Sequence, residues 1–327
     1  MAFKDILGQE RQVGIIRKAI ENDRIPHAYL FLGEQGVGKK LMALTLAKAL
    51  NCFNETSDSC DMCLSCRKIT SGNHPDITIV EPEGNFIKVN QIRGLQRSFQ
   101  YKPYEGKKRV CVIPSAEKMN PAAANSFLKT LEEPSSDTII ILITTSPHML
   151  LLTINSRCQR LKFQPLPTSI ISRVIREKLG EGEDVASRIA SLARGSLARA
   201  FELAEGSTME YRTRLVKKIN SLSPDDIDNT FKLAEEMSKE KDQLIDILEF
   251  LKTWFRDLLI FQEGRPLDRL INIDFLADIQ RLAGKSTAMD LVEKVRIIND
   301  TQSALLHNSN KRLAMEVMLT RLCQKFP

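Results

Sequence analysis

The sequence predicts an α/β domain with a parallel β-sheet, followed by a part built only of helices. Two observations support this fold class. Up to Pro165, short aliphatic segments alternate with helical segments, which is the pattern of a parallel sheet covered by helices on both faces. From Gln164-Pro165-Leu166-Pro167 onward, we find no segment with the character of a strand.

The N-terminal elements follow from apolar runs and helical periodicity. Ala28–Leu32 is an apolar run typical of a buried strand. The segment after it is predicted to be a helix over 39–50, because its apolar residues recur on one face. Further strands are expected at 76–81, 109–113, 138–144 and 159–163, and further helices at 89–99 and at 121–132, which Pro134 closes.

The C-terminal part is predicted to be helical throughout. Helices are expected at 239–261 and 287–307, the second with Leu291, Val295, Ile298 and Leu305 near helical spacing. Boundaries near residues 165 and 206 then give three domains, over 1–165, 166–205 and 206–327.

Composition sets the class of protein. The chain has 327 residues, 43% of them hydrophobic and 27% charged, as expected of a globular protein. The net charge of +6 permits nucleic-acid contact without requiring it. Met1–Asp5 lacks the apolar stretch of a signal peptide, and the longest aliphatic run, Ile139–Ile143, is far too short to span a membrane. We therefore expect a cytoplasmic protein without membrane contact.

A phosphate-binding loop is predicted at Gly33-Glu34-Gln35-Gly36-Val37-Gly38-Lys39-Lys40. The loop follows a strand and opens a helix, which is the context that a P-loop requires. Gly33, Gly36 and Gly38 would let backbone N–H groups approach phosphate oxygens, and Lys39 would reach the β- and γ-phosphates.

The loop lacks groups that hydrolysis needs. Lys40 replaces the Ser or Thr whose hydroxyl binds Mg²⁺. Pro114 and Ser115 follow the third strand, where an acidic pair would hold the metal ion and activate water. The sequence therefore predicts no Mg²⁺ site and little hydrolysis. It leaves ATP binding open, because the loop could equally be a relic turn. Glu117 could replace the acidic pair only if its loop were shifted.

A metal site is predicted from Cys52, Cys60, Cys63 and Cys66, spaced C-x₇-C-x₂-C-x₂-C. Four thiolates suit tetrahedral Zn²⁺ with no open position, which makes the predicted site structural. Four unligated thiols are the alternative. The other cysteines, at 111, 158 and 323, are expected to be ordinary core residues.

These motifs, together with three further segments, resemble the clamp-loader family of bacterial AAA+ ATPases. The further segments are Phe3–Glu10, His27–Phe31 and Asn120–Pro134. The resemblance covers most of residues 1–205 and fades in the C-terminal helices. It implies a RecA-like AAA+ domain over 1–165 with a zinc module at 52–66, a helical lid over 166–205, and a helical collar over 206–327 that joins subunits.

The resemblance also implies roles for single residues. Ser156-Arg157-Cys158 matches the family's Ser-Arg-Cys motif, so Arg157 would be an arginine finger that acts in trans on ATP held by the adjacent subunit. A surface ion pair is the alternative. Arg199 falls near the sensor-2 position, where a phosphate contact and a structural ion pair are both open. Thr144 or Thr145 falls at the sensor-1 position.

The departures from the motor pattern select a branch of the family. A motor subunit of the gamma/tau type should keep the loop Ser or Thr and the acidic pair, and this chain keeps neither. A lost hydrolytic site with a retained Arg157 is similar to a stator subunit. The resemblance implies a hetero-pentameric ring with gamma/tau and delta subunits, which loads a sliding clamp onto primed DNA as part of the DNA polymerase III holoenzyme.

Two other functions stay open at this point. The chain could be an active AAA+ ATPase with atypical Mg²⁺ ligation through Glu117. It could also be a zinc-dependent DNA-binding module on a relic ATPase fold, although residues 52–66 carry no aromatic stacking array. Lys107-Lys108-Arg109 is interpreted as a solvated approach to a strand rather than a DNA contact.

Overall fold

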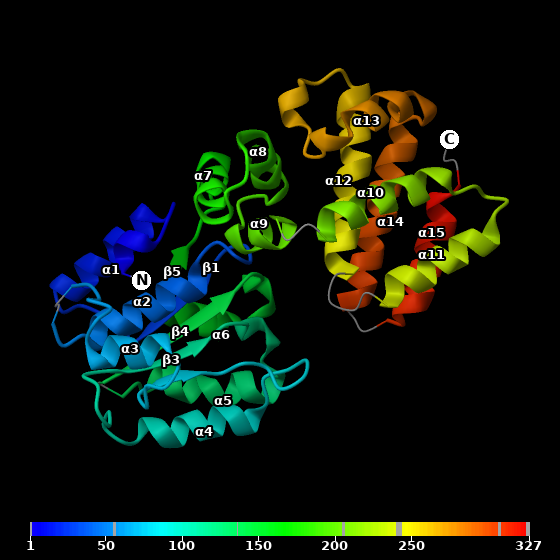
Figure 1. Cartoon of the computed structure of the whole chain (residues 1–327). Coiled ribbons are helices and arrows are strands. Elements are labelled where there is room, and N and C mark those ends of the chain that lie inside the picture. Colours follow the sequence, from blue (N-terminus) through cyan, green and yellow to red (C-terminus); the bar gives the residue numbers. More distant parts are fainter. Residues whose placement is uncertain are drawn as a thin grey trace. The chain divides into compact units, whose positions relative to one another are not determined.

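The computed structural model describes residues 2–54, 57–135, 137–204, 207–239, 244–306 and 309–324. The chain divides into two compact units, one formed by Met1–Glu181 with Ala193–Ala200 and the other by Gly182–Leu192 with Phe201–Pro327 (Figure 1). The predicted fold class, an α/β domain followed by helices, is confirmed. The three-domain division at 165 and 206 stays a prediction.

The first unit is built on a five-stranded parallel sheet in the order β2-β3-β4-β1-β5. The strands are β1 (Ala28–Leu32), β2 (Ile77–Ile79), β3 (Arg109–Ile113), β4 (Thr138–Thr144) and β5 (Gln159–Lys162). β1 lies inside the sheet, with Leu30 paired to Leu142 of β4 and Arg160 of β5. The loops that follow β1, β3 and β4 therefore leave the same edge of the sheet, where open α/β sheets bind ligands.

Helices cover both faces of this sheet (Figure 1). Alternate residues of β1 point to opposite faces, as in any strand. Phe31 packs in one core cluster with Ile16 and Met42, whereas Leu30 packs in the other with Phe127. The helices of this unit are α1 (Glu10–Glu21), α2 (Lys39–Asn51), α3 (Leu64–Thr70), α4 (Val89–Phe99), α5 (Pro121–Glu132), α6 (Leu152–Arg157) and α7 (Thr168–Leu179), with 3₁₀ turns at Phe3–Asp5, Ala116–Lys118 and Pro147–Met149.

The second unit is helical, and its described residues contain no strand. Its core gathers around Trp254, which meets the ring of Phe275 edge-on at 5.8 Å between centroids. None of the described helices is both long enough and apolar enough to cross a membrane. The helices of the second unit are α8 (Glu183–Leu192), α10 (Ser207–Ser221), α11 (Ile227–Lys239), α12 (Leu244–Gln262), α13 (Leu276–Leu282), α14 (Ala288–Leu306) and α15 (Lys311–Leu322), with 3₁₀ turns at Leu267–Arg269, Ile273–Phe275 and Ala283–Lys285. Helix α9 (Leu197–Ala204) begins in the first unit and ends in the second.

The predicted bounds differ from the structure at a few places. The strand predicted over 76–81 is confirmed only over 77–79. Asp76, just before it, is buried, and its carboxylate accepts hydrogen bonds from the N–H groups of Tyr104 and Glu105. The helix predicted over 239–261 begins at Leu244 in the structure, and residues 240–243 lie outside the described residues. Residue 307, the predicted end of the other long helix, also lies outside them.

Candidate functional site: a phosphate loop, an exposed arginine and a four-cysteine cluster

The predicted phosphate loop joins β1 to α2, with the strand and the helix where the sequence placed them. Its backbone adopts positive φ at Gly33 (148°), Gly36 (77°) and Gly38 (97°), and Gly38 caps α2. These conformations strain any residue with a Cβ. The glycines therefore let the chain turn directly from the sheet edge into the helix.

Lys39 is turned back onto its own loop. Its side chain is 6% exposed, and Nζ donates hydrogen bonds to the carbonyls of Gly33 and Glu34, the latter at 2.6 Å. Burial lowers the pKa of Lys39 to about 8, against the opposing fields of Glu34 and Glu117. In this conformation the ammonium group is occupied by backbone oxygens of the loop.

The start of α9 packs against the tip of the loop. The Leu197 N–H donates to the Gly36 carbonyl at 3.1 Å. A Cβ added at Gly36 would lie 2.1 Å from Ser196 Oγ. The same helix carries Arg199, whose backbone N–H donates to Ser196 Oγ at 3.2 Å. The structure thus brings the sensor-2 segment to the loop, while the role of the Arg199 side chain stays a prediction.

Lys40, Pro114 and Ser115 stand at the positions where the sequence lacks metal-binding groups. Lys40 Nζ forms an exposed ion pair with Glu81 at 2.8 Å, and this pair lowers the pKa of Glu81. Pro114 and Ser115 directly follow β3, at the edge of the sheet where the phosphate loop begins. Neither side chain offers a carboxylate. Glu117 lies on the next turn, close enough for its field to act on Lys39, and its Oε2 is buried without a hydrogen-bond partner.

Thr144 and Thr145, the two candidates for the sensor-1 position, differ in exposure. Thr144 ends β4 and is buried, and its hydroxyl accepts a hydrogen bond from the Ser146 N–H at 3.0 Å. Thr145 is exposed.

Arg157 is the last residue of α6 and reaches the surface. Its side chain is 35% exposed. One terminal nitrogen donates to the Thr153 carbonyl at 3.1 Å, and the other to Glu132 Oε1 at 2.7 Å. Sequence reasoning missed Glu132 as a partner. The available signal was a carboxylate in the last turn of a helix, where the helix dipole disfavours it.

The four predicted metal ligands come together in space. The sulfur atoms of Cys52, Cys60, Cys63 and Cys66 all lie within 4.8 Å of one another. Cys52 follows α2, and Cys63 caps α3. The cluster offers four soft donors around one centre, which fits a tetrahedral metal ion.

Backbone hydrogen bonds favour the thiolate at Cys63, whereas burial and the hydrogen bond with Cys63 raise the pKa of the neighbouring Cys66. The Cys63 N–H donates to Cys60 Sγ at 3.3 Å, and the Cys66 N–H donates to Cys63 Sγ at 3.4 Å. Partial burial raises the pKa of Cys63, but hydrogen bonds from the backbone of Phe53 and Cys66 outweigh burial and lower the pKa to about 6. A thiolate is the form that binds a metal.

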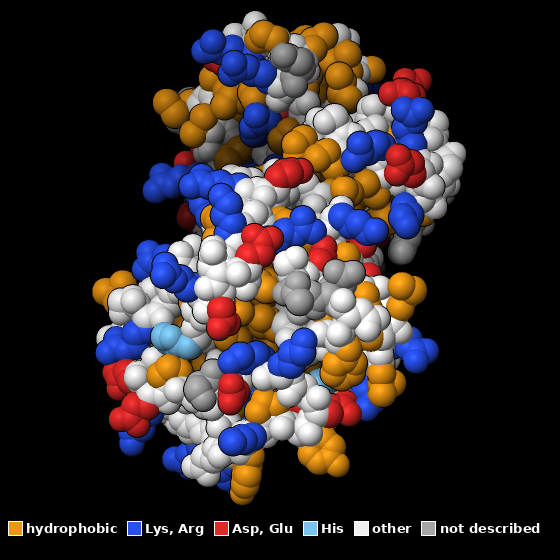
Figure 2. Space-filling model, turned by 90° about the vertical axis from the view of Figure 1, so that its left-hand side faces the viewer, with side chains coloured by type: hydrophobic (Ala, Val, Ile, Leu, Met, Phe, Trp, Pro, Cys, Tyr) orange, Lys and Arg blue, Asp and Glu red, His pale blue; other side chains and the backbone are white. Residues whose placement is uncertain are grey.

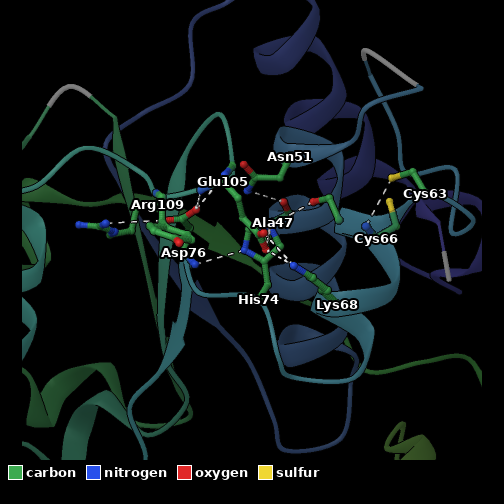
Figure 3. Close-up of polar contacts among 12 residues, drawn as sticks. Ala47, Asn51, Cys63, Cys66, Lys68, His74, Asp76, Glu105 and Arg109 are labelled. Carbon is green, nitrogen blue, oxygen red and sulfur yellow. Dashed lines mark hydrogen bonds and ion pairs between the residues drawn. The ribbon is translucent and has the colours of Figure 1, made fainter.

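Polar contacts connect the segment that carries the four cysteines, residues 52–66 and here called the cysteine module, to the sheet (Figure 3). Lys68 of α3 pairs with Glu105 at 2.7 Å. The backbone N–H of Glu105 donates to the Asp76 carboxylate at 2.9 Å, and Asp76 also pairs with Arg109. Arg109 was predicted to be solvated, but it is buried in the structure, so that prediction was wrong for this residue. His74 lies between these groups, with Nε2 3.2 Å from Ser65 Oγ. The module is therefore fixed to the fold rather than suspended in a loop.

The predicted basic run is likewise bound within the fold. Lys107 Nζ donates to the Cys52 carbonyl at 2.7 Å, Lys108 pairs with Asp137 at 3.0 Å, and Arg109 donates to the carbonyls of Tyr101 and Lys102 at 3.0 Å each. On the face drawn in Figure 2, Lys and Arg side chains are scattered, with Asp and Glu side chains between them. The hydrogen bonds and the ion pair of Lys107, Lys108 and Arg109 within the fold do not favour a DNA-binding surface at this run.

Comparison with protein families gives two matches that together span most of the chain. Residues 8–167 match the family described as DNA polymerase III, delta subunit. Residues 207–324 match the family of the delta subunit's C-terminal part.

The relatives that this chain matches over most of their length include delta' subunits of DNA polymerase III. The chain is 36% identical over 322 residues to DNA polymerase III subunit delta' of Bacillus subtilis, covering 96% of each chain. It is 31% identical to the delta' subunit of Pseudomonas aeruginosa, covering 90% of this chain and 91% of that one. The tau subunit of Bacillus subtilis is 28% identical, and the match covers 98% of this chain but 61% of tau.

Proposed function

Because this chain belongs to the delta' subunit family of DNA polymerase III, we propose that it is a stator of the clamp loader. It hydrolyses little or no ATP itself, and it supplies Arg157 to ATP held by a neighbouring subunit. One observation carries the proposal: a phosphate loop without metal-binding groups is combined with an exposed guanidinium at the end of α6.

The loop geometry supports a non-hydrolysing site. Lys40 replaces the residue whose hydroxyl would bind Mg²⁺, and its ammonium group is paired with Glu81 instead. A positioned general base is worth about 10²–10⁴ in rate, and Ser115 is a poor substitute for one. Because Lys39 is bonded to its own loop, nucleotide must also displace these contacts before it can use that side chain.

The cysteine cluster is proposed to hold one structural Zn²⁺. Four sulfur donors leave no position for a reacting water, so such an ion would order the module rather than take part in chemistry.

Partners follow from the family. We propose that gamma/tau and delta subunits join this chain in a hetero-pentameric ring through the second unit, and that the ring contacts a sliding clamp and primed DNA. As part of a replicative polymerase it would act in the bacterial cytoplasm.

The test is ATP hydrolysis by an assembly of this chain with a motor subunit and delta. We expect Arg157→Ala to slow hydrolysis at the one site that Arg157 faces by about 10³-fold or more, so the assembly loses that site's share of its turnover. Lys162→Ala removes an exposed cation of β5 and is the matched control. Unchanged turnover in the Arg157 variant, with assembly intact, would falsify the finger assignment.

Glu117 supports one competing function, an active ATPase with atypical metal ligation. Its Oε2 is buried without a hydrogen-bond partner, and its field acts on Lys39. This reading requires Mg²⁺-dependent turnover by the isolated chain that both Glu117→Gln and Lys39→Ala abolish. If the isolated chain does not hydrolyse ATP, this competing function is ruled out.

A further inference from the structure

We propose that Glu132 is a positioning residue for Arg157: its carboxylate holds the guanidinium at the surface, aimed at the neighbouring subunit's nucleotide. The proposal rests on the proposed function, because it concerns how the arginine of this chain reaches a phosphate in trans.

The backbone that carries Arg157 is already fixed. The inner face of α6 is buried at Ile154 and Asn155. The Asn155 side-chain amide donates to the carbonyls of Pro147 and Leu150, at 3.1 and 3.4 Å. These contacts tie the short helix to the turn before it. The remaining freedom is that of the long Arg157 side chain.

Two hydrogen bonds restrict this side chain. One terminal nitrogen donates to the Thr153 carbonyl of the same helix, and the other donates to Glu132 Oε1 at 2.7 Å. A guanidinium has five N–H donors in a fixed plane, so donors remain available when both contacts are made. The 35% exposure of Arg157 leaves them accessible to a phosphate from outside the chain. The carboxylate can therefore stay in place while the finger works.

The position of Glu132 at a helix C-terminus supports a role in binding the Arg157 guanidinium. Glu132 is the last residue of α5. The carbonyl groups at a helix C-terminus carry partial negative charge and disfavour a carboxylate by local electrostatics. Arg157 supplies the compensating cation from another helix, 25 residues further along the chain.

The pair contributes little to the stability of the fold. The side chains are 35% and 48% exposed, and ion pairs at such sites are weak because water screens them. Removing the carboxylate should therefore leave the protein folded. Its effect should be visible in the chemistry of the neighbouring site instead.

The experiment is a double-mutant cycle in the assembly of full-length chain, motor subunit and delta. We expect Glu132→Ala to lower kcat for ATP at the site facing Arg157 by about two- to five-fold, as for the loss of one partly exposed ion pair, with KM unchanged. Glu132→Gln keeps a hydrogen-bond acceptor and should recover part of the loss. In the Arg157→Ala background, Glu132→Ala should have no further effect. Glu133→Ala, which changes the adjacent exposed carboxylate, is the control and should behave as the parent chain.

Each outcome separates the two proposals. An equal loss from Glu132→Ala in both backgrounds overturns the positioning role, because Glu132 would then act independently of Arg157. A silent Glu132→Ala beside an impaired Arg157→Ala also overturns it and leaves the stator function standing. A silent Arg157→Ala overturns both the positioning role and the finger assignment on which it rests.

Discussion

At the scale of single residues, the phosphate loop has the glycine backbone of a P-loop but lacks residue types that bind Mg²⁺ and activate water. The three positive-φ glycines are present, and Lys39 lies against the loop carbonyls. What is missing is a hydroxyl at position 40 and an acidic pair after β3. These are separate deficits. The hydroxyl would supply one ligand to Mg²⁺, whereas the acidic pair would supply another ligand and also activate the attacking water.

Lys40→Thr tests whether these deficits are independent. We expect no gain in ATP hydrolysis by the isolated chain, because Pro114 and Ser115 still provide no carboxylate. The fold should persist, since the Lys40–Glu81 pair is exposed. Adding Pro114→Asp and Ser115→Glu should give Mg²⁺-dependent turnover at least about 10²-fold above Lys40→Thr. Phosphate release is the measurement, with Lys39→Ala added to the triple variant as the control. Turnover by Lys40→Thr alone would contradict the assignment of Pro114 and Ser115.

At the scale of elements, the cysteine module links α2 and α3 to the rest of the first unit. Lys48 of α2 is buried and forms an ion pair with Asp61, inside the module. Asp58 accepts hydrogen bonds from the Phe3 N–H at 3.0 Å and from Arg17. Ordering of the module is therefore coupled to the N-terminal segment and to α1.

Metal removal should consequently destabilise the first unit. We expect one Zn²⁺ per chain by elemental analysis, and its loss in Cys63→Ser. The thermal midpoint of that variant should fall by about 5–10 °C, as for a few kcal/mol in a domain of this size. Cys323→Ser lies in the second unit and is the control. A metal-free parent chain with the same midpoint as a zinc-loaded one would argue against the site.

At the scale of the whole molecule, buried carboxylates in the two units have pKa values that are shifted in opposite directions. Burial raises the pKa of Asp76, but hydrogen bonds from the N–H groups of Tyr104, Glu105 and Gly106 outweigh it, so the pKa lies below its usual value. In the second unit, burial raises the pKa of Asp257 and of Asp274.

As the pH is lowered, the first unit should therefore unfold at a higher pH than the second. The stability that Asp76 contributes is complete above its unfolded pKa of about 3.9 and is lost as the pH falls below that value. Asp257 and Asp274 bind protons more readily in the folded protein than in the unfolded chain. As the pH falls toward about 3.9, the unfolded pKa of Asp, their protonation therefore stabilises the second unit. Trp254, the single tryptophan, reports on the second unit.

Two probes followed from pH 7 to pH 2 test this order. Loss of circular dichroism should precede the change in Trp254 fluorescence, and Asp76→Asn should shift only the first transition. A fluorescence change that comes first would refute the assignment of acid sensitivity to Asp76.

The sequence by itself determined the features that depend on residue type and short-range spacing. The parallel sheet followed from apolar runs between helical periods, and β1 and β3 to β5 lie where those runs are. The glycine loop, its missing hydroxyl and the spacing of four cysteines could also be read locally, because each motif spans few residues.

The tertiary structure alone decided which side chains meet. Glu132 and Arg157 are 25 residues apart in the chain, Lys40 and Glu81 are 41 apart, and α9 reaches Gly36 from a distant segment. No local pattern encodes such pairs. They arise because a parallel sheet gathers the turns that follow its strands, with Lys40 and Glu81, at one edge and the helix ends that precede its strands, with Glu132 and Arg157, at the other. Helix packing then fixes which of these segments are neighbours.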